Sequence, residues 1–251
     1  MRWEELSWPK HKEMVEAGAT VVLPFASIEQ HGPHAPVGVD TFLVSEVCGK
    51  AVEGLENVLL TPTMWAGFAV HHLTHPGTFS LSLQTYISLV QELVRSAASH
   101  GYKKFLLVNG HGGNHQSIQA ALNPLRQELG IDVWMVTYFH LGNEISGEIR
   151  VSEIGGMAHS GEFETAMMMH LRPELIDLSE AVKNTFHPVH PLMTRDMHHR
   201  GILFRPPDFH RDRNPSGVLG DPATANAENG ARYFEAVAAR LREIIQSLAA
   251  L

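Results

Sequence analysis

Residues 27–41 contain carboxylate and imidazole side chains at a spacing that suits a metal ion. Glu29 and His31 are two residues apart, so in an extended segment their side chains point to the same side. The glycines and prolines that follow let the chain fold back, which can bring Asp40 to the same place. Such oxygen and nitrogen donors bind zinc, manganese or iron, and a carboxylate can bridge two ions. Alternatively, Asp40 caps a helix that begins at Thr41, and the histidines lie on a surface loop.

A second cluster, at residues 108–115, reads Val-Asn-Gly-His-Gly-Gly-Asn-His and follows an apolar run. Its glycines let the backbone approach a bound group, and the helix that it opens offers free N–H donors. A phosphate loop is the competing interpretation, but the Lys-Ser/Thr pair and the G-x-G-x-x-G spacing are both absent. We therefore expect His111 to extend over the edge of a sheet.

The third cluster contains His159, Glu162 and Glu164. On a helix, His159 and Glu162 share one face, whereas Glu162 and Glu164 point in roughly opposite directions. At most one of the two glutamates is thus expected to bind a given metal ion directly. Each of the three clusters lies at a predicted strand end or helix start, which favours one shared site over three separate ones.

Composition narrows the function classes further. The 251 residues include 27 acidic and 19 basic side chains, a net charge of −8, which argues against a nucleic-acid partner. A hydrophobic share of 44% excludes disorder as the main state, and the single cysteine excludes an internal disulfide and a cysteine zinc site. The polar start of the chain and the short apolar runs indicate neither a secretory signal nor a membrane span, so we expect a cytoplasmic protein.

Short β-rich runs alternate with helical patterns along the first half of the chain. The expected strands cover residues 19–25, 58–61, 104–108 and 131–138, and the expected helices cover residues 41–55, 83–101 and 116–129. This alternation predicts an α/β fold with a mostly parallel sheet. Further on, we expect a helix over residues 159–171, an irregular excursion over residues 184–215 and a final helix after Asp221-Pro222. No linker or break in composition interrupts residues 1–251, which predicts a single domain.

Five motifs in a fixed order carry a resemblance to a known family. They are Ser27-Ile-Glu-Gln-His-Gly-Pro-His34 with Gly38-Val-Asp-Thr41, Gly67 to His72 with Pro76-Gly-Thr78, Asn109-Gly-His-Gly-Gly-Asn114, His159-Ser-Gly-Glu-Phe-Glu-Thr165, and Gly217-Val-Leu-Gly-Asp-Pro222. With these motifs between about residue 20 and about residue 235, the sequence resembles the creatininase family of metal-dependent amidohydrolases.

The resemblance implies a three-layer α/β/α sandwich that cleaves a carbon–nitrogen bond of a small amide or cyclic amide. It implies two divalent metal ions, zinc or manganese or both, with iron as a further option. One ion would be held by Glu29, Asp40 and His111, and the other by His31, Asp40 and Glu164. Asp40 would thus bridge the two ions, which would activate a hydroxide between them. His159 would transfer the proton, and the chain would form a homo-oligomer, as large as a hexamer.

The sequence also departs from the creatinine-cleaving pattern. Where those members carry an aromatic residue and a glutamate after the second-cluster histidine, this chain has Gly112 and Gly113. We therefore expect Glu162 to supply the carboxylate that Gly113 lacks, as a second catalytic residue. The expected substrate pocket comprises His72, Thr78, Gly112 and Gly113.

Two alternative functions stay open at this stage. The glycine-rich second cluster also resembles the deformylase and peptidase relatives of creatininase, so the substrate could be a formamide or a small peptide. A function of another class is a non-catalytic metal-binding or nucleotide-binding module, in which residues 109–115 cradle a phosphate.

Overall fold

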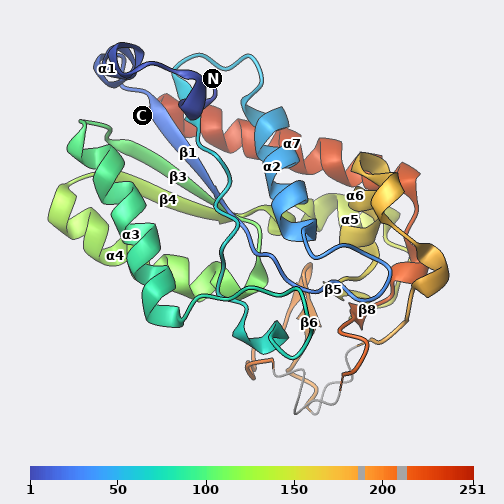
Figure 1. Cartoon of the computed structure of the whole chain (residues 1–251). Helices are drawn as coiled ribbons and strands as arrows, with labels where there is room; N and C mark the ends of the chain where they lie inside the picture. Colours follow the sequence, from blue (N-terminus) through green and yellow to red (C-terminus); the bar gives the residue numbers. More distant parts are fainter. Residues whose placement is uncertain (186–189, 208–213) are drawn as a thin grey trace.

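The computed structural model describes residues 1–185, 190–207 and 214–251, and its centre is a four-stranded parallel sheet (Figure 1). The strand order is β2-β1-β3-β4. The strands span Val58–Leu60 (β2), Thr20–Phe25 (β1), Lys104–Asn109 (β3) and Asp132–Thr137 (β4). Each of these strands consists largely of apolar and β-branched residues, as strands covered on both faces require.

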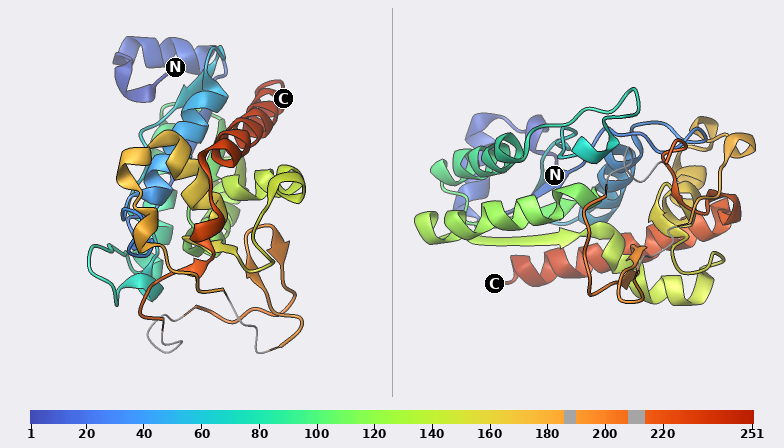
Figure 2. Two further views of the ribbon diagram at one scale, coloured as in Figure 1. Left: turned by 90° about the vertical axis from the view of Figure 1, so that its right-hand side faces the viewer. Right: turned by 90° about the horizontal axis from the view of Figure 1, so that it is seen from below.

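Helices cover both faces of this sheet, which confirms the predicted α/β sandwich (Figure 2). On one face pack α2 (Val39–Val52), α6 (Glu162–Leu171) and α7 (Ala227–Ala249), and on the other α3 (Leu83–Ser99) and α4 (His115–Leu129). Successive strand residues alternate between the two cores, so Val22 packs with the first group and Val21 with the second. Helix α1 (Trp8–Glu16) adds Met14 to the second core.

Most expected elements of the first half form where the sequence predicts them, but the starts of one helix there and of one helix in the second half differ. Helix α2 begins at Val39, so Asp40 lies inside its first turn instead of capping it. Helix α6 begins at Glu162, and His159 belongs instead to strand β5 (Met157–His159). The chain turns between them at Ser160, whose φ is +55°. The expectation that His159 and Glu162 share one helix face was therefore wrong.

The second half is irregular, as predicted, and contains short elements that hydrophobic periodicity does not reveal. Helix α5 (Asn143–Ile149) precedes β5, which pairs antiparallel with β8 (Leu219–Gly220). Within the predicted excursion, β6 (Arg195–Asp196) and β7 (His199–Arg200) form a small hairpin. Residues 186–189 and 208–213 of that excursion lie outside the described residues. Short 3₁₀ helices complete the secondary structure of the described residues: Trp3–Glu5, Val70–His72, Gly112–Asn114, Tyr138–Gly142, Pro173–Leu175, Leu178–Glu180 and Pro222–Thr224.

Asp196 anchors this β6–β7 hairpin to the body of the molecule. Its carboxylate accepts hydrogen bonds from the Arg150 guanidinium, with Nη2–Oδ2 at 2.6 Å, and from the Gly155 backbone N–H at 2.7 Å. Because Asp196 is buried and fully paired, these bonds stabilise the hairpin where it borders the site described below. Among the described residues, none of the helices has the length and apolar character needed to cross a bilayer.

Candidate active site

The first two clusters meet because they follow neighbouring strands. Phe25 at the end of β1 lies beside Asn109 at the end of β3 in parallel register, and ligands bind to open α/β sheets at this edge. Glu29 and His111 extend from the two strand ends, and Glu29 Oε2 lies 2.9 Å from His111 Nδ1. Both side chains are buried, and this pair forms the floor of the site.

Asp40 lies between the two histidines of these clusters. Its Oδ2 is 3.1 Å from His111 Nδ1, and its Oδ1 is 3.4 Å from His31 Nε2. Each carboxylate oxygen therefore faces one imidazole nitrogen, which is the arrangement that a bridging carboxylate needs. The first turn of α2 holds Asp40 in this position, since Val39 and Leu43 of the same helix are packed in the core.

Glu164 comes from the first turn of α6 and completes the cluster. Its Oε1 lies 3.8 Å from His31 Nε2, and its Oε2 accepts a hydrogen bond from the Ser160 backbone N–H at 2.6 Å. Among the described residues, three sets of donor atoms, each within 4.8 Å of one another, could hold an ion. They are Glu29, Asp40 and His111; His31, Asp40 and Glu164; and Glu29, His31 and His159. Asp40 is common to the first two sets, as expected for the two-ion site that the sequence predicts.

Backbone carbonyls fix the orientation of both histidines. His31 Nδ1 lies 3.0 Å from the Glu29 carbonyl oxygen, and His111 Nε2 lies 3.2 Å from that of Phe68. A carbonyl only accepts, so these nitrogens carry the ring protons of the neutral imidazoles. In the neutral form of each ring, His31 Nε2 and His111 Nδ1 consequently direct lone pairs into the cluster, in the way that metal-binding histidines are held.

The polar atoms at the centre of the cluster require a positive charge. Glu29 Oε2, His31 Nε2 and Asp40 Oδ2 are buried without a hydrogen-bond partner among the described residues, and such groups are costly unless compensated. Although burial opposes it, the carboxylates of Glu29 and Asp40 raise the pKa of His111 to about 10. Without an added cation, a proton on His111 therefore lies between its ring nitrogen and the facing carboxylate oxygens of Glu29 and Asp40. The oxygen and nitrogen donors of this cluster also fit divalent cations.

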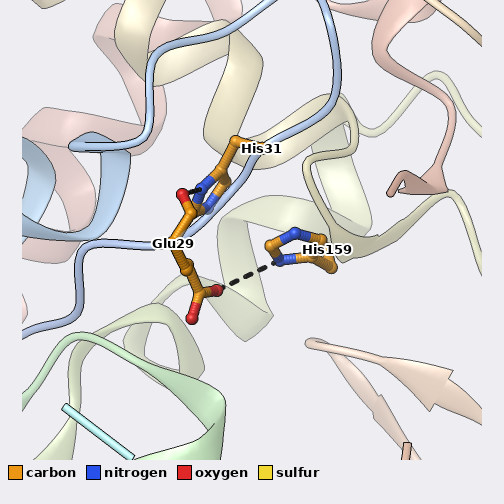
Figure 3. Close-up of side chains that lie close together, drawn as sticks. All are labelled: Glu29, His31 and His159. Atoms are coloured by element: carbon orange, nitrogen blue, oxygen red, sulfur yellow. Dashed lines mark hydrogen bonds and ion pairs between the residues drawn. The ribbon is translucent and has the colours of Figure 1, made fainter. Parts of the chain in front are cut away.

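His159 borders this cluster from strand β5 (Figure 3). Its Nδ1 lies 3.5 Å from Glu29 Oε1, and its Nε2 lies 2.9 Å from the Gln30 carbonyl oxygen. Burial, together with the charge of His31, lowers the pKa of His159 well below its ordinary value, so the ring is neutral. A neutral imidazole whose Nε2–H is bound to a carbonyl has a basic Nδ1, which can accept a proton.

Glu162 does not join the cluster, contrary to expectation. Its carboxylate accepts hydrogen bonds from the backbone N–H groups of Val151, at 2.9 Å, and Ser152, at 2.6 Å. Glu162 and Glu164 both begin α6 but point in different directions, as their spacing predicts. Glu162 therefore stabilises the segment before β5, and it does not replace a carboxylate at Gly113.

A cavity of about 770 Å³ opens above the cluster and reaches Glu29, Asp40, His111, His159 and Glu164. Of the expected pocket residues, His72, Gly112 and Gly113 line it. Thr78 is not part of this lining, and its Oγ1 instead accepts a hydrogen bond from the Gln30 backbone N–H at 3.1 Å.

Much of the cavity wall was not predicted from the sequence. The additional apolar and aromatic lining comes from several segments: Phe68, Val70, Leu83, Ile87, Phe139, Met193, Leu203 and Phe204. Arg195 of the β6–β7 hairpin adds a cationic side chain. The apolar residues of the irregular excursion were an available signal, because an exposed segment without regular structure has little other reason to carry Leu203 and Phe204.

Comparisons with known proteins agree with this geometry. A family model described as creatinine amidohydrolase matches residues 4–245. A mycofactocin precursor peptide peptidase of Mycolicibacterium smegmatis is 32% identical over 85% of this chain and 79% of its own length. A creatinine amidohydrolase of Pseudomonas putida is 30% identical over 92% of this chain and 90% of its own length.

Solved structures extend the similarity to the whole fold. A crystal structure of creatininase superimposes with a TM-score of 0.82 at 26% identity, covering 98% of this chain and 97% of the other. Creatininase structures with the same coverage include a Zn–Zn form of a mutant and a Mn form. The α/β sandwich, the buried donor cluster and the match over nearly the entire sequence lead to one conclusion: this chain belongs to the creatininase family of metal-dependent hydrolases, which act on carbon–nitrogen bonds.

Proposed function

We propose that this chain hydrolyses the amide bond of a peptide-like substrate that carries a bulky apolar group, using two divalent cations. The observation that carries the proposal is the cavity of about 770 Å³ with its largely apolar wall, directly above the donor cluster. Such a volume lies within the range typical of sites for drug-sized ligands, well beyond what a small ring requires.

One cation would be held by Glu29, Asp40 and His111 and the other by His31, Asp40 and Glu164. Zinc and manganese both suit these oxygen and nitrogen donors. Bound there, the cations would supply Lewis acidity, which lowers the pKa of a water molecule and polarises a substrate carbonyl. Family membership argues against the nucleotide-binding alternative, because the members of this family are hydrolases.

The protein's own residues move the proton. His159 Nδ1 faces the cluster and accepts a proton from the attacking water, and the imidazolium then donates it to the leaving nitrogen. The Gln30 carbonyl oxygen, 2.9 Å from Nε2, keeps the ring oriented through both transfers and stabilises its charged form.

The glycine pair Gly112-Gly113 lines the cavity beside the cluster. A Cβ at Gly113 would overlap the Phe68 carbonyl oxygen and the His111 ring, so this position has no room for a side chain. Gly112 has open space where its Cβ would lie. The main chain is therefore bare beside the cluster, which lets an extended substrate backbone approach closely. This feature, with the mycofactocin precursor peptide peptidase relatives, supports a peptide over a ring.

A small cyclic amide is the second candidate, because the creatinine amidohydrolase relative covers more of both chains than the peptidase of Mycolicibacterium smegmatis. A small ring would reach the donor cluster but leave most of the apolar wall unused. A formamide is disfavoured for the same reason.

The test is a metal count followed by a substrate panel. Protein loaded with Zn²⁺ or Mn²⁺ and freed of excess should retain close to two ions per chain by elemental analysis. Amine release is then measured for short peptides with aromatic or small side chains and for N-formyl amino acids, and ring opening is measured for creatinine. We expect kcat/KM for aromatic peptides to exceed that for creatinine at least tenfold. Faster cleavage of creatinine would overturn the peptide assignment, and absence of bound metal would overturn the amidohydrolase mechanism.

Assembly and location stay predictions. Sedimentation velocity tests the homo-oligomer, up to a hexamer, that the family resemblance implies, and fractionation of the source cells tests the expected cytoplasmic location.

A further inference from the structure

The side-chain amide of Gln30 lies at the centre of a buried group of polar atoms between the two clusters. Its Nε2 is 2.9 Å from the Gly217 carbonyl oxygen, 2.9 Å from His72 Nδ1 and 3.1 Å from His159 Nε2. Its Oε1 accepts a hydrogen bond from the Gly32 backbone N–H at 2.9 Å, which fixes which end of the amide is the donor. Gln30 is 5% exposed and His72 is 2% exposed, so these contacts are shielded from bulk water.

The positions of the hydrogen atoms determine which nitrogen atoms donate hydrogen bonds in this group. His159 Nε2 lies 2.9 Å from the main-chain carbonyl oxygen of Gln30 and must donate to it, because a carbonyl has no proton. That nitrogen then has no lone pair for the Gln30 amide. The two N–H bonds of Gln30 Nε2 therefore go to the two remaining acceptors, the Gly217 carbonyl and His72 Nδ1.

The tautomer of His72 follows from this. Since Nδ1 accepts a hydrogen bond, the proton of the neutral ring is on Nε2. His72 Nε2 lies 3.4 Å from Glu29 Oε1, and the other oxygen of that carboxylate lies 2.9 Å from His111 Nδ1. An N–H facing Oε1 attracts and orients the Glu29 carboxylate, whereas a lone pair there would repel it.

Gly217 is shaped to fit this amide. Its φ is +74°, which favours glycine, and a Cβ there would overlap Gln30 Oε1. The Gly217 motif of the family resemblance, which the catalytic scheme above does not use, thus leaves room for the Gln30 side chain.

We propose that Gln30 is a positioning residue: its side chain fixes the Nε2–H tautomer of His72 and thereby orients Glu29 toward its cation. Its main-chain carbonyl fixes the Nε2–H tautomer of His159 independently of the side chain. The inference deepens the proposed function and rests on it, because it assigns Glu29 to a metal ion. Groups that orient ligands in this way change metal affinity by roughly 10–100-fold when they are removed.

Three variants test the relay from Gln30 through His72. Gln30→Met keeps the length of the side chain but cannot hydrogen-bond, and His72→Phe keeps a ring but has no N–H; the third combines both. Zn²⁺ affinities are measured by competition with a chromophoric chelator. We expect each single variant to lower the affinity for one of the two Zn²⁺ ions at least tenfold. The double variant should bind Zn²⁺ with the same affinity as His72→Phe alone.

Additive losses in the double variant would overturn the relay, because two independent packing defects add. So would unchanged Zn²⁺ affinity in Gln30→Met. If the unmodified protein itself fails to bind two ions, the proposed function fails instead, so the two failures are distinguishable.

Neutron diffraction from crystals of the zinc-loaded protein reads the tautomers directly. We expect deuterium on Nε2 of both His72 and His159 and none on their Nδ1 atoms. In Gln30→Met, His159 should keep its Nε2 deuterium, because the main-chain carbonyl is still present. Deuterium on His72 Nδ1 in the unmodified protein would overturn the proposal.

Discussion

The donor cluster and the cavity wall above it are built in opposite ways. Glu29, Asp40 and His111 are each 3% exposed or less, and they extend from strand ends and a helix turn within the core. Leu203 and Phe204 in the wall are 46% and 70% exposed and belong to an irregular segment. Elements of the core thus hold the donor cluster, whereas under the proposed function the choice of substrate depends on an irregular, exposed segment.

The largest effect is expected at Asp40, the one side chain shared by the two donor sets that are proposed to hold the ions. Asp40→Ala should lose both ions, since His31 and His111 then have no common carboxylate. Losing several kcal/mol of charge stabilisation corresponds to about 10³-fold or more in kcat/KM. Elemental analysis and amine release measure the two losses, and two retained ions would contradict the bridging role.

The next largest effect is expected at His159. His159→Ala should keep both ions, because the two sets proposed to hold them do not include His159, which forms a third possible set with Glu29 and His31. The value of kcat should fall by about 10²–10⁴-fold, as for removal of a general acid–base group. Metal loss equal to that of Asp40→Ala would instead assign His159 to direct coordination.

The contrast between the donor cluster and the cavity wall also explains which parts of the site could be predicted from the sequence. Glu29, His31, Asp40 and His111 were identified as one site because strand ends and helix starts leave a clear pattern, and parallel pairing brings those ends together. Glu162 was expected in the cluster because Gly113 lacks a carboxylate, but sequence spacing does not reveal the backbone N–H groups of Val151 and Ser152 that it binds instead. Gln30 was overlooked because its partners His72, His159 and Gly217 come from distant segments, which only tertiary structure unites.

A smaller effect is expected from the wall. Phe204→Ala removes apolar contact from the cavity lining, which should lower kcat/KM about tenfold for peptides with an aromatic side chain. Creatinine cleavage and metal content should not change. Ile202→Ala is the matched control, since Ile202 is 87% exposed and does not line the cavity. Equal losses in both variants would indicate a general disturbance of the segment.

The smallest effect concerns the anchoring of the wall by His198. Its Nε2 donates to the Phe139 carbonyl oxygen at 3.0 Å, and burial lowers its pKa from 6.5 to about 4. The unfolded chain therefore binds a proton between these pH values that the folded chain does not, so His198 destabilises the fold as the pH falls from about 6.5 to about 4.

Thermal unfolding of the metal-free protein, measured across this range of pH, tests the anchor. His198→Gln should show a shallower fall in Tm than the unmodified protein, because it lacks the titrating ring. Parallel curves of Tm against pH for the two proteins would show that His198 does not contribute to the pH dependence of stability.

Anomalous diffraction from crystals loaded with Mn²⁺ or Zn²⁺ tests the central claim most directly. The account predicts two peaks per chain, one between Glu29, Asp40 and His111 and the other between His31, Asp40 and Glu164, with Asp40 contacting both. A single peak, or peaks away from these five side chains, would contradict it.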